Sequence, residues 1–424
     1  MSTQSKERDY FSDPEVLLDP YDYFEEMYAK GPITKMAMHD VLMVTGYDEA
    51  VDVLRNNVDF SGVNALVPDM PLPFTPQGDD IVEQIEAHRS EIFGSNLIVA
   101  YDGVAHARLR AVASRLFTPS ILKANEAFMF DYADQLARNA AASGGCELVN
   151  EIATPFVTLV VADLLGVDAA NRDKFAELIH SCSAVGNIDS EEETPSKFEA
   201  LMAIAVLMGE FITERRENPR EDVLTTLATS KYQDGTDVPL DELITLSAFL
   251  FAAGQDTSAK LLSNSMRHMI ERPGLQQKIR ENPELIPAFI EEVLRLEGST
   301  KATFRVAVRN TRIGDRVVPA GQRVVVALGA ANRDPRRWEN PTEFVFDRPR
   351  IREHLSFGRG VHTCLGAPLA RAEVKIMLER LIEHTSDFQI SEEKHGKPGN
   401  RRFQYEPSYI IRGLDYFYVD MKQR

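Results

Sequence analysis

The sequence predicts a mainly α-helical protein with small β-sheets, organised as one domain over residues 1–424. Three observations support this fold class. Apolar residues recur at helical spacing over most of the chain, and short runs of β-branched residues bounded by glycine and proline cluster after residue 300. No repeat, linker or low-complexity segment divides the sequence.

The first part of the chain predicts a helix, a strand and a second helix between Tyr21 and Phe60, with Val41–Thr45 as the strand and Gly46 as its end. Residues 64–80 are rich in proline and turn formers, which predicts an irregular loop. Helical periodicity then predicts long helices at about residues 103–141, 151–164, 170–184, 196–217 and 240–270.

A further helix is expected at Leu285–Leu296, after Pro283 and before Gly298. Three short strands should follow, and the predicted ranges are 305–308, 311–313 and 323–328. Helical spacing resumes after Cys364, and residues 405–419 predict a pair of strands around Gly413.

Composition narrows the possible functions. The chain is 44% apolar and 26% charged, and 65 acidic against 47 basic residues give a net charge of −18, which argues against nucleic acid as the main partner. The polar N-terminus lacks an apolar signal core, and no apolar run is long enough to span a membrane. Three cysteines, Cys146, Cys182 and Cys364, are too few for a disulfide framework, so a reducing, cytoplasmic location is expected.

The most specific pattern lies between His354 and Glu373. Gly358, Gly360 and Gly366 permit tight turns and the close approach of a flat group, and Cys364 lies where a helix is about to start. Backbone N–H groups at a helix start lower the pKa of a thiol and favour thiolate. A thiolate without a second nearby cysteine indicates a metal cofactor with a single protein ligand, whereas the usual inert buried cysteine explains Cys146 and Cys182.

The run Phe357-Gly358-x-Gly360-x-His362-x-Cys364-x-Gly366 resembles the haem-binding loop of the cytochrome P450 family. The next residues, Leu369-Ala370-Arg371-x-Glu373, are similar to those of bacterial members. The resemblance implies a cytochrome P450 fold in which haem b is sandwiched between a long distal helix and a proximal cysteine loop, here residues 354–373. It also implies that Cys364 is the axial iron ligand and that Phe357 shields its sulfur.

Four further segments are similar to family motifs. The first is the pair Glu292 and Arg295, which would form an ordinary i,i+3 ion pair on a helix. In the family this pair meets a second arginine in a buried network that braces the cysteine loop. Arg348 is the expected third member and Arg350 the alternative, and we assign the network to fold stability and haem retention.

The second segment is Ala253–Ser258, which follows the apolar helix 243–253 and by itself indicates a polar turn on an exposed helix face. The resemblance places it on the distal side of the haem. Ala253 and Gly254 would leave room for dioxygen and widen the helix locally. Thr257 would supply a hydroxyl hydrogen bond, and Asp256 would relay protons through waters, so both are the expected catalytic residues.

The third and fourth segments supply groups for the haem propionates. His106 and Arg110 lie four residues apart on one helix face, and arginine binds carboxylates through two N–H groups. The resemblance implies that both bind propionates, together with Arg305 and His362. Arg108 is interpreted as a solvated surface charge.

The reaction implied by the resemblance is insertion of one oxygen atom from O2 into a small organic substrate, by hydroxylation or oxidative demethylation. The chain has no flavin or nicotinamide fingerprint and no spare cysteines for an iron–sulfur cluster. Electrons are therefore expected from a separate ferredoxin with its NAD(P)H-dependent reductase, and the chain is expected to act as a monomer.

Residues 333–371 contain eight arginines and five acidic residues, a local charge of +3 that could steer an acidic ferredoxin. Arg348 and Arg371 are expected to be internal, and Arg359 and Arg115 to lie on the surface. The arginines are Arg333, Arg336, Arg337, Arg348, Arg350, Arg352, Arg359 and Arg371.

Three other functions are compatible with the same cysteine loop. A peroxide-driven peroxygenase and a nitric oxide reductase would not need the intact Asp256–Thr257 pair. A haem-thiolate sensor or carrier without turnover would leave this pair idle, although nothing in the sequence excludes it.

The family pocket falls on mostly apolar and small residues, which indicates an apolar substrate with few polar anchors. Lys301 is either a surface lysine or a partner for a substrate carboxylate, and Ser299 stands where proline is common in the family. The expected lining residues are Val99, Leu246, Phe249, Leu250, Ala302, Thr303 and Ile410.

Overall fold

The computed structural model describes residues 8–167, 171 and 194–424, of which residues 194–201 are described by their backbone alone. Most of the described chain is helical. The helices are α1 (Pro14–Leu18), α2 (Tyr21–Ala29), α3 (Tyr47–Arg55), α4 (Val82–Ala87), α5 (Gly103–Ser114), α6 (Pro119–Ala142), α7 (Thr154–Leu164), α9 (Thr194–Glu217), α10 (Val223–Ala228), α11 (Leu240–Glu271), α12 (Leu275–Glu281), α13 (Ile286–Glu297), α14 (Leu328–Ala331), α15 (Ala367–His384) and α16 (Glu392–His395).

The strands form small sheets. They are β1 (Ile33–Lys35), β2 (Val41–Val44), β3 (Phe60–Ser61), β4 (Gly145–Glu147), β5 (Thr303–Ala307), β6 (Thr311–Ile313), β7 (Arg316–Val318), β8 (Arg323–Val326), β9 (Thr385–Ile390) and β10 (Tyr418–Gln423). One sheet has the order β1-β2-β8-β5-β3, with β2 and β8 parallel, a second has the order β4-β10-β9, and β6 pairs with β7.

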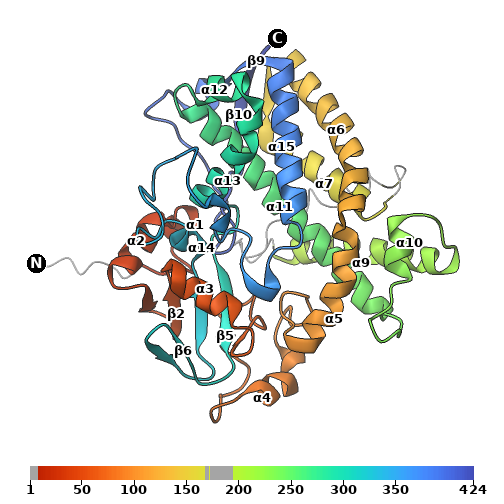
Figure 1. Cartoon of the computed structure of the whole chain (residues 1–424), viewed down its shortest axis with the longest axis vertical. Coiled ribbons are helices and arrows are strands. Elements are labelled where there is room, and N and C mark those ends of the chain that lie inside the picture. The colour runs from red at the N-terminus through yellow and green to blue at the C-terminus, as the bar shows by residue number, and fades with distance from the viewer. Residues whose placement is uncertain (1–7, 168–170, 172–193) are drawn as a thin grey trace, which may run out of the picture.

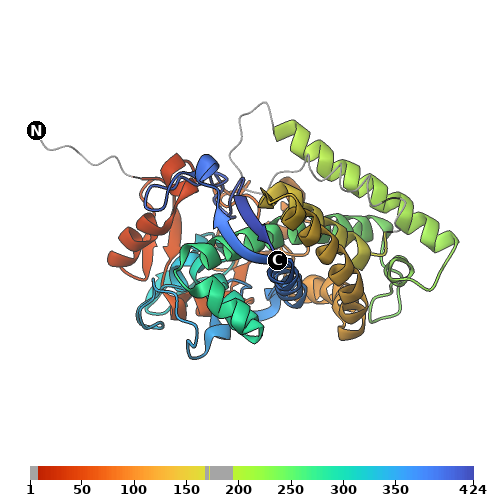
Figure 2. The same ribbon diagram turned by 90° about the horizontal axis from the view of Figure 1, so that it is seen from above.

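The molecule has a sheet-rich side and a helical side. Figure 1 shows the five-stranded sheet with α1–α3 on one side and α6, α7 and α9 on the other, while α11 runs through the middle beside α15. Contacts join α11 to α7, α9, α13 and α15. Viewed from above, α9 lies along one edge of the molecule (Figure 2). The long helix α11 therefore separates the helical side from the sheet-rich side.

The five-stranded sheet is buried on both faces. Along β2, Leu42 and Val44 pack into one apolar cluster, whereas Val41 and Met43 pack into another on the opposite face. Because side chains of a strand alternate between the two faces, this sequence of consecutive apolar residues is what a covered strand requires. No described helix is both long and apolar enough to cross a membrane.

The predicted helix at 103–141 is wrong as one element. It is divided into α5 and α6 by a short 3-10 turn at Arg115–Phe117. Pro119 begins α6, and Thr118 before it is extended, because the proline ring disfavours helical backbone in the preceding residue. The expected helix at 151–164 is also modified, since Val149–Ala153 forms a π-helical turn before α7.

The predicted strand pair within residues 405–419 is wrong too. Among the described residues this segment pairs with itself only through an isolated bridge between Tyr405 and Leu414, and Ile411 forms a bridge to Thr300. The terminal strand β10 pairs instead with β9 and β4. The strands that pair with β10 are not joined to it by a short turn, so the sequence contains no hairpin pattern that would predict this pairing. The helix expected at 170–184 falls outside the described residues apart from position 171, and Cys182 lies outside them as well. The helices predicted at 196–217, 240–270 and 285–296 are confirmed.

Candidate functional site

The part of the cysteine loop that precedes α15, residues 354–366, owes its backbone conformation to two glycines. Gly358 and Gly360 have φ angles of +68° and +74°, in the left-handed region that glycine adopts without steric cost. A Cβ atom on Gly360 would lie 2.4 Å from the carbonyl oxygen of Leu54. Gly366, in contrast, has a φ of −75° and needs no glycine-specific conformation. The loop shape therefore requires glycine at two of its three positions.

Cys364 lies just before α15. Its N–H group donates a hydrogen bond of 2.9 Å to the carbonyl oxygen of Phe357, which closes the loop. The side chain is exposed although protein atoms surround it closely. Burial raises the pKa of the thiol more than the backbone N–H groups of Gly366 and Ala367 and the Arg110 guanidinium lower it. The expected decrease of the thiol pKa is therefore wrong for the protein alone.

A buried ionic network joins α13 to the segment that precedes this loop. The Glu292 carboxylate accepts hydrogen bonds from Arg295 at 2.8 and 2.9 Å and from Arg348 at 3.0 and 3.1 Å. The side chains of Glu292 and Arg295 are fully buried. In the structure Arg348 is thus the arginine that contacts Glu292 together with Arg295, whereas the alternative, Arg350, is exposed.

A second buried network next to the loop was not predicted. Glu291, beside Glu292 on α13, accepts from Arg371 of α15 at 2.5 and 3.0 Å and lies 3.0 Å from His354 of the loop. Burial opposes the shift, but the hydrogen bonds from His354 and Arg371 lower the pKa of Glu291 to about 2. The Arg371 guanidinium also covers the ring of Phe357 at 4.6 Å. Helices α13 and α15 therefore both hold the cysteine loop.

Two predicted histidines come together beside the loop. The rings of His106 on α5 and His362 lie 4.1 Å apart, and the Nε2 atoms of both are buried without a hydrogen-bond partner among the described residues. Arg110, on the same face of α5 as His106, donates to the Thr363 carbonyl oxygen at 2.5 Å. Burial lowers the pKa of His106 to about 4, so this ring is neutral near pH 7.

Arg305 on β5 completes the cationic side of the site. Its guanidinium is buried, donates to the Phe304 carbonyl oxygen at 2.6 Å, and forms no ion pair with any described carboxylate. Asp102 is the nearby acid: it accepts from Ser61 and lies 3.6 Å from His362 Nε2. A buried arginine without a carboxylate partner is costly unless a ligand supplies the negative charge.

The chemistry of this donor set fits haem b. Cys364 offers a thiol as an iron ligand. The Nε2 atoms of His106 and His362, which have no hydrogen-bond partner among the described residues, can bind acidic oxygens. Arg305 still has N–H groups without a carboxylate. A haem brings an iron ion and two propionates, which are the groups that these residues lack.

The predicted distal segment lies in the middle of α11 rather than at a helix end. Ala253 is exposed, and Gly254 and Thr257 are half-buried, in a helix whose following turns are buried. The Thr257 hydroxyl donates to the Ala253 carbonyl oxygen at 2.9 Å, and Ser299 donates to the Thr257 carbonyl oxygen at 2.6 Å. The expected widening of the helix is wrong, because α11 keeps α-helical backbone throughout this segment.

Asp256 lies beside two charged residues that sequence reasoning missed. Its carboxylate is 4.0 Å from the ammonium of Lys260, which bonds at 2.8 Å to Glu406 in the C-terminal segment. Burial is the largest influence and raises the pKa of Asp256 to about 7, with Lys260 lowering it and Glu406 raising it. Spacing alone could have indicated Lys260, four residues after Asp256, but nothing in the sequence places Glu406 there.

Two of the expected pocket residues belong to the core instead. Leu246 and Ala302 are each 1% exposed and pack within apolar clusters, so they offer no surface to a ligand. Val99, Phe249, Leu250, Thr303 and Ile410 are half-buried and stay predicted lining residues.

Both interpretations of Lys301 are wrong. Its side chain is buried, and its ammonium donates to the Leu17 carbonyl oxygen at 2.7 Å, away from the surface and from any substrate carboxylate. Burial lowers its pKa well below the usual value. Cys146 is half-buried and burial raises its pKa to about 12, as expected for an unreactive thiol.

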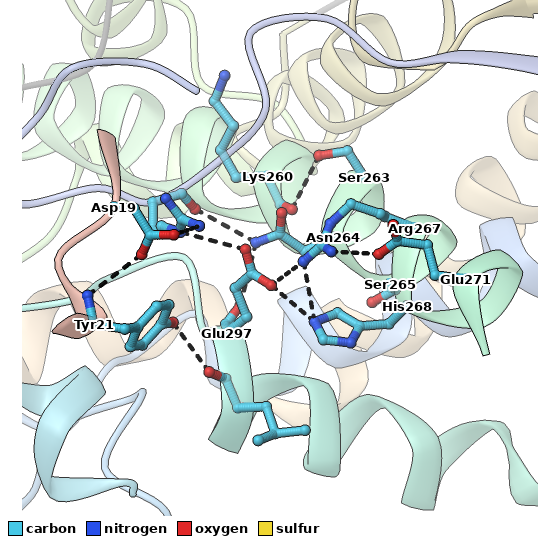
Figure 3. Close-up of polar contacts among 12 residues, drawn as sticks. Asp19, Tyr21, Lys260, Ser263, Asn264, Ser265, Arg267, His268, Glu271 and Glu297 are labelled. Carbon is cyan, nitrogen blue, oxygen red and sulfur yellow. Dashed lines mark hydrogen bonds and ion pairs between the residues drawn. The ribbon is translucent and has the colours of Figure 1, made fainter. Parts of the chain in front are cut away.

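A third buried cluster surrounds Glu297 at the end of α13 (Figure 3). It bonds to Arg267 and His268 of α11, and Arg412 of the C-terminal segment lies 3.3 Å away. Burial opposes the shift, but Arg267 and the other cations keep the pKa of Glu297 well below its usual value. The cluster fixes the C-terminal segment against α11.

Comparison with known proteins supplies an independent line of evidence. The family model for cytochrome P450 matches residues 75–404. The substrate-free structure of cytochrome P450 CYP150A6 from Mycobacterium marinum is 42% identical, with a TM-score of 0.91, and the match covers 98% of this chain and 99% of that one.

Two further relatives carry information on activity and ligands. CYP109E1 from Bacillus megaterium, solved in complex with corticosterone, is 26% identical with a TM-score of 0.80, covering 96% of this chain and 99% of that one. The cytochrome P450 monooxygenase PikC from Streptomyces venezuelae is 29% identical over 93% of this chain and 89% of its own length.

Proposed function

The chain belongs to the cytochrome P450 family and is a P450 monooxygenase, and from this premise we propose that it hydroxylates or oxidatively demethylates a small, mostly apolar organic substrate. The observation that carries the proposal is Cys364, an accessible thiol just before α15, in a loop that is held by the buried network of Glu291, Arg371 and His354. When bound, haem b supplies the redox chemistry that activates dioxygen.

In this proposal the chain's own residues hold the cofactor at two points. Cys364 would bind the iron through its sulfur, and Phe357, whose ring lies under the Arg371 guanidinium, would shield that sulfur. His106, Arg110, Arg305 and His362 bind the propionates, which gives the unpaired donors described above their acceptors. Ala253, which is exposed, and the half-buried Gly254 are the residues of α11 that would leave room for dioxygen beside the haem.

Asp256 and Thr257 of α11 are the residues that supply protons in this proposal. Thr257 has a hydroxyl that can turn from the Ala253 carbonyl oxygen toward the distal side, where it accepts and donates hydrogen bonds. Asp256 is the proton carrier, because burial holds its pKa near the working pH and one of its oxygens has no described partner.

Electrons come from a separate ferredoxin with its reductase. Five of the eight arginines in residues 333–371 are committed to partners inside the protein. Arg350, Arg352 and Arg359 form no ion pair with a described carboxylate and, with exposed Arg115, are the residues that we assign to ferredoxin steering. The proposal includes a monomeric chain in the cytoplasm, where a free cysteine thiol stays reduced.

The substrate class follows from a ligand titration of the purified ferric protein. The panel contains aromatic acids, monoterpenoids, norisoprenoids, steroids and fatty acids. We expect one class to shift the Soret band from low spin to high spin, because an apolar ligand displaces the water on the iron. An intact haem spectrum that no ligand of any class shifts would argue against a small apolar substrate.

The peroxygenase and sensor alternatives are separated by turnover of that ligand. We expect product with NAD(P)H, ferredoxin and reductase, and less product with hydrogen peroxide alone, since Asp256 and Thr257 are both present. Product with peroxide alone at the higher rate would favour a peroxygenase. Absence of product under both conditions would favour a sensor.

A further inference from the structure

We propose that Glu406 and Lys260 are positioning residues for Asp256. By holding the Lys260 ammonium away from Asp256, Glu406 leaves the Asp256 carboxyl free to take up and release a proton. The inference rests on the proposed function, in which Asp256 supplies protons toward Thr257, and it names the residues of this chain that set that supply.

The geometry shows two carboxylates competing for one ammonium. Lys260 Nζ lies 2.8 Å from Glu406 Oε1 and 2.9 Å from the Leu414 carbonyl oxygen, but 4.0 Å from Asp256 Oδ1. An ammonium has three N–H groups, and two of them are used by Glu406 and Leu414. Asp256 therefore lies beyond hydrogen-bond distance of an ammonium that is already bonded to two other acceptors.

The acids on both sides of Lys260 are incompletely paired. Asp256 Oδ2 and Glu406 Oε2 are both buried without a hydrogen-bond partner among the described residues. Asp415, on the same C-terminal segment, also faces Lys260 but bonds to Gln404 at 3.0 Å. The described charged groups that act on Asp256 are thus Lys260 from its own helix and Glu406 from the segment packed against it.

Backbone packing holds the side chains of Glu406 and Lys260 next to each other. A Cβ atom on Gly413 would lie 2.2–2.6 Å from three carbons of the Lys260 side chain, so this side chain lies directly on the Gly413 backbone. The Glu406 N–H group donates to the Gly413 carbonyl oxygen at 3.2 Å. In Figure 3 the Lys260 side chain extends away from the cluster around Glu297.

The substitution Glu406→Gln separates positioning from simple packing. It keeps the side-chain volume, removes the charge that raises the Asp256 pKa, and releases Lys260 to pair with Asp256 directly. Both changes lower the Asp256 pKa. We expect a decrease of at least about one pH unit, so that the protonated fraction of Asp256 above its midpoint falls roughly tenfold.

The test is an infrared pH titration of the ferric, haem-loaded protein without substrate or electron donor. The signal is the carboxylic-acid C=O band that is present in the wild type and absent from the variant Asp256→Asn. Asp415→Asn is the matched control, because it removes one negative charge from the same segment without releasing Lys260. Lys260→Gln is the second variant, and it should move the midpoint in the opposite direction, to higher pH.

The expected pattern is a lower midpoint in Glu406→Gln, a higher one in Lys260→Gln, and little change in Asp415→Asn. An unchanged midpoint in either variant of the pair, or no titrating band assignable to Asp256, overturns the inference. If Glu406→Gln does not fold, the direction of the Lys260→Gln shift decides. The reduced carbon monoxide spectrum of the same samples reports the haem-thiolate ligation separately, so a failure of the proposed function is distinguishable from a failure of this inference.

Discussion

Removing the carboxylate of Glu292 should cost the protein a large part of its stability. The group accepts four hydrogen bonds from Arg295 and Arg348 and a fifth from the Val345 N–H group at 3.0 Å. The side chains of Glu292 and Arg295 are 0% exposed, and that of Arg348 is 4% exposed. The variant Glu292→Ala therefore leaves two guanidinium groups buried without a counter-charge.

The size of the loss can be worked from this burial. Breaking a buried ion pair by removing one partner costs about 3–5 kcal/mol. An exposed i,i+4 pair is worth about 0.3–0.5 kcal/mol. Lys375 and Glu379 on α15 form such a pair at 3.4 Å, so Glu379→Ala is the matched control. Since natural domains are stable by about 5–15 kcal/mol, only the buried variant should approach unfolding at room temperature.

The assay is urea unfolding followed by circular dichroism at neutral pH, with the haem spectrum recorded in parallel. We expect Glu292→Ala to unfold at much lower urea and to lose haem first, because the network holds segments next to the cysteine loop. Glu292→Gln keeps the side-chain shape and one acceptor oxygen, so its urea midpoint should lie between those of Glu292→Ala and the wild type. A Glu292→Ala protein within about 1 kcal/mol of the wild type would refute the argument.

Two further predictions concern the loop itself. Glu291→Gln should make the free energy of unfolding fall less steeply at acid pH. A carboxyl whose pKa is lowered to about 2 stabilises the fold above its ordinary pKa of 4.5 and loses this contribution as the pH falls toward 2. Urea midpoints measured from pH 5 to pH 2 would check this prediction, and a loss of stability as steep as that of the wild type would contradict it. Gly360→Ala should lower the melting temperature and the haem content, because φ is +74° and the new Cβ atom would meet the Leu54 carbonyl oxygen. Gly399→Ala is the control, because Gly399 has a φ of +82° but open space around it, so the difference between the two variants measures the effect of the steric clash.

The residues that sequence reasoning placed correctly are those whose partners are near in sequence or belong to a motif. Glu292 and Arg295 are one helical turn apart, and Gly358 and Gly360 of the cysteine loop indicate its turns directly. The break at Pro119 was missed, although a proline ends the preceding segment, because helical periodicity is present on both sides of it.

The residues that were missed acquire their roles only through tertiary contacts. Lys260 and Glu406 are 146 positions apart, and Glu291 meets Arg371 across 80 positions. Lys301 is a further example, since a lysine in a polar stretch gives no sign that its ammonium will be buried against the Leu17 carbonyl oxygen. Burial also reversed the expected direction of the Cys364 pKa, which depends on neighbours that spacing does not specify.

The most direct test of the account is the spectrum of the dithionite-reduced, haem-loaded protein under carbon monoxide, recorded for the wild type and for Cys364→Ser. The wild type should show the strongly red-shifted Soret band of a thiolate-ligated ferrous carbon monoxide complex, and Cys364→Ser should lose that band while keeping the circular dichroism of the folded chain. A wild type that binds haem without this band, or a Cys364→Ser protein that retains it, would contradict the assignment of Cys364 as the iron ligand.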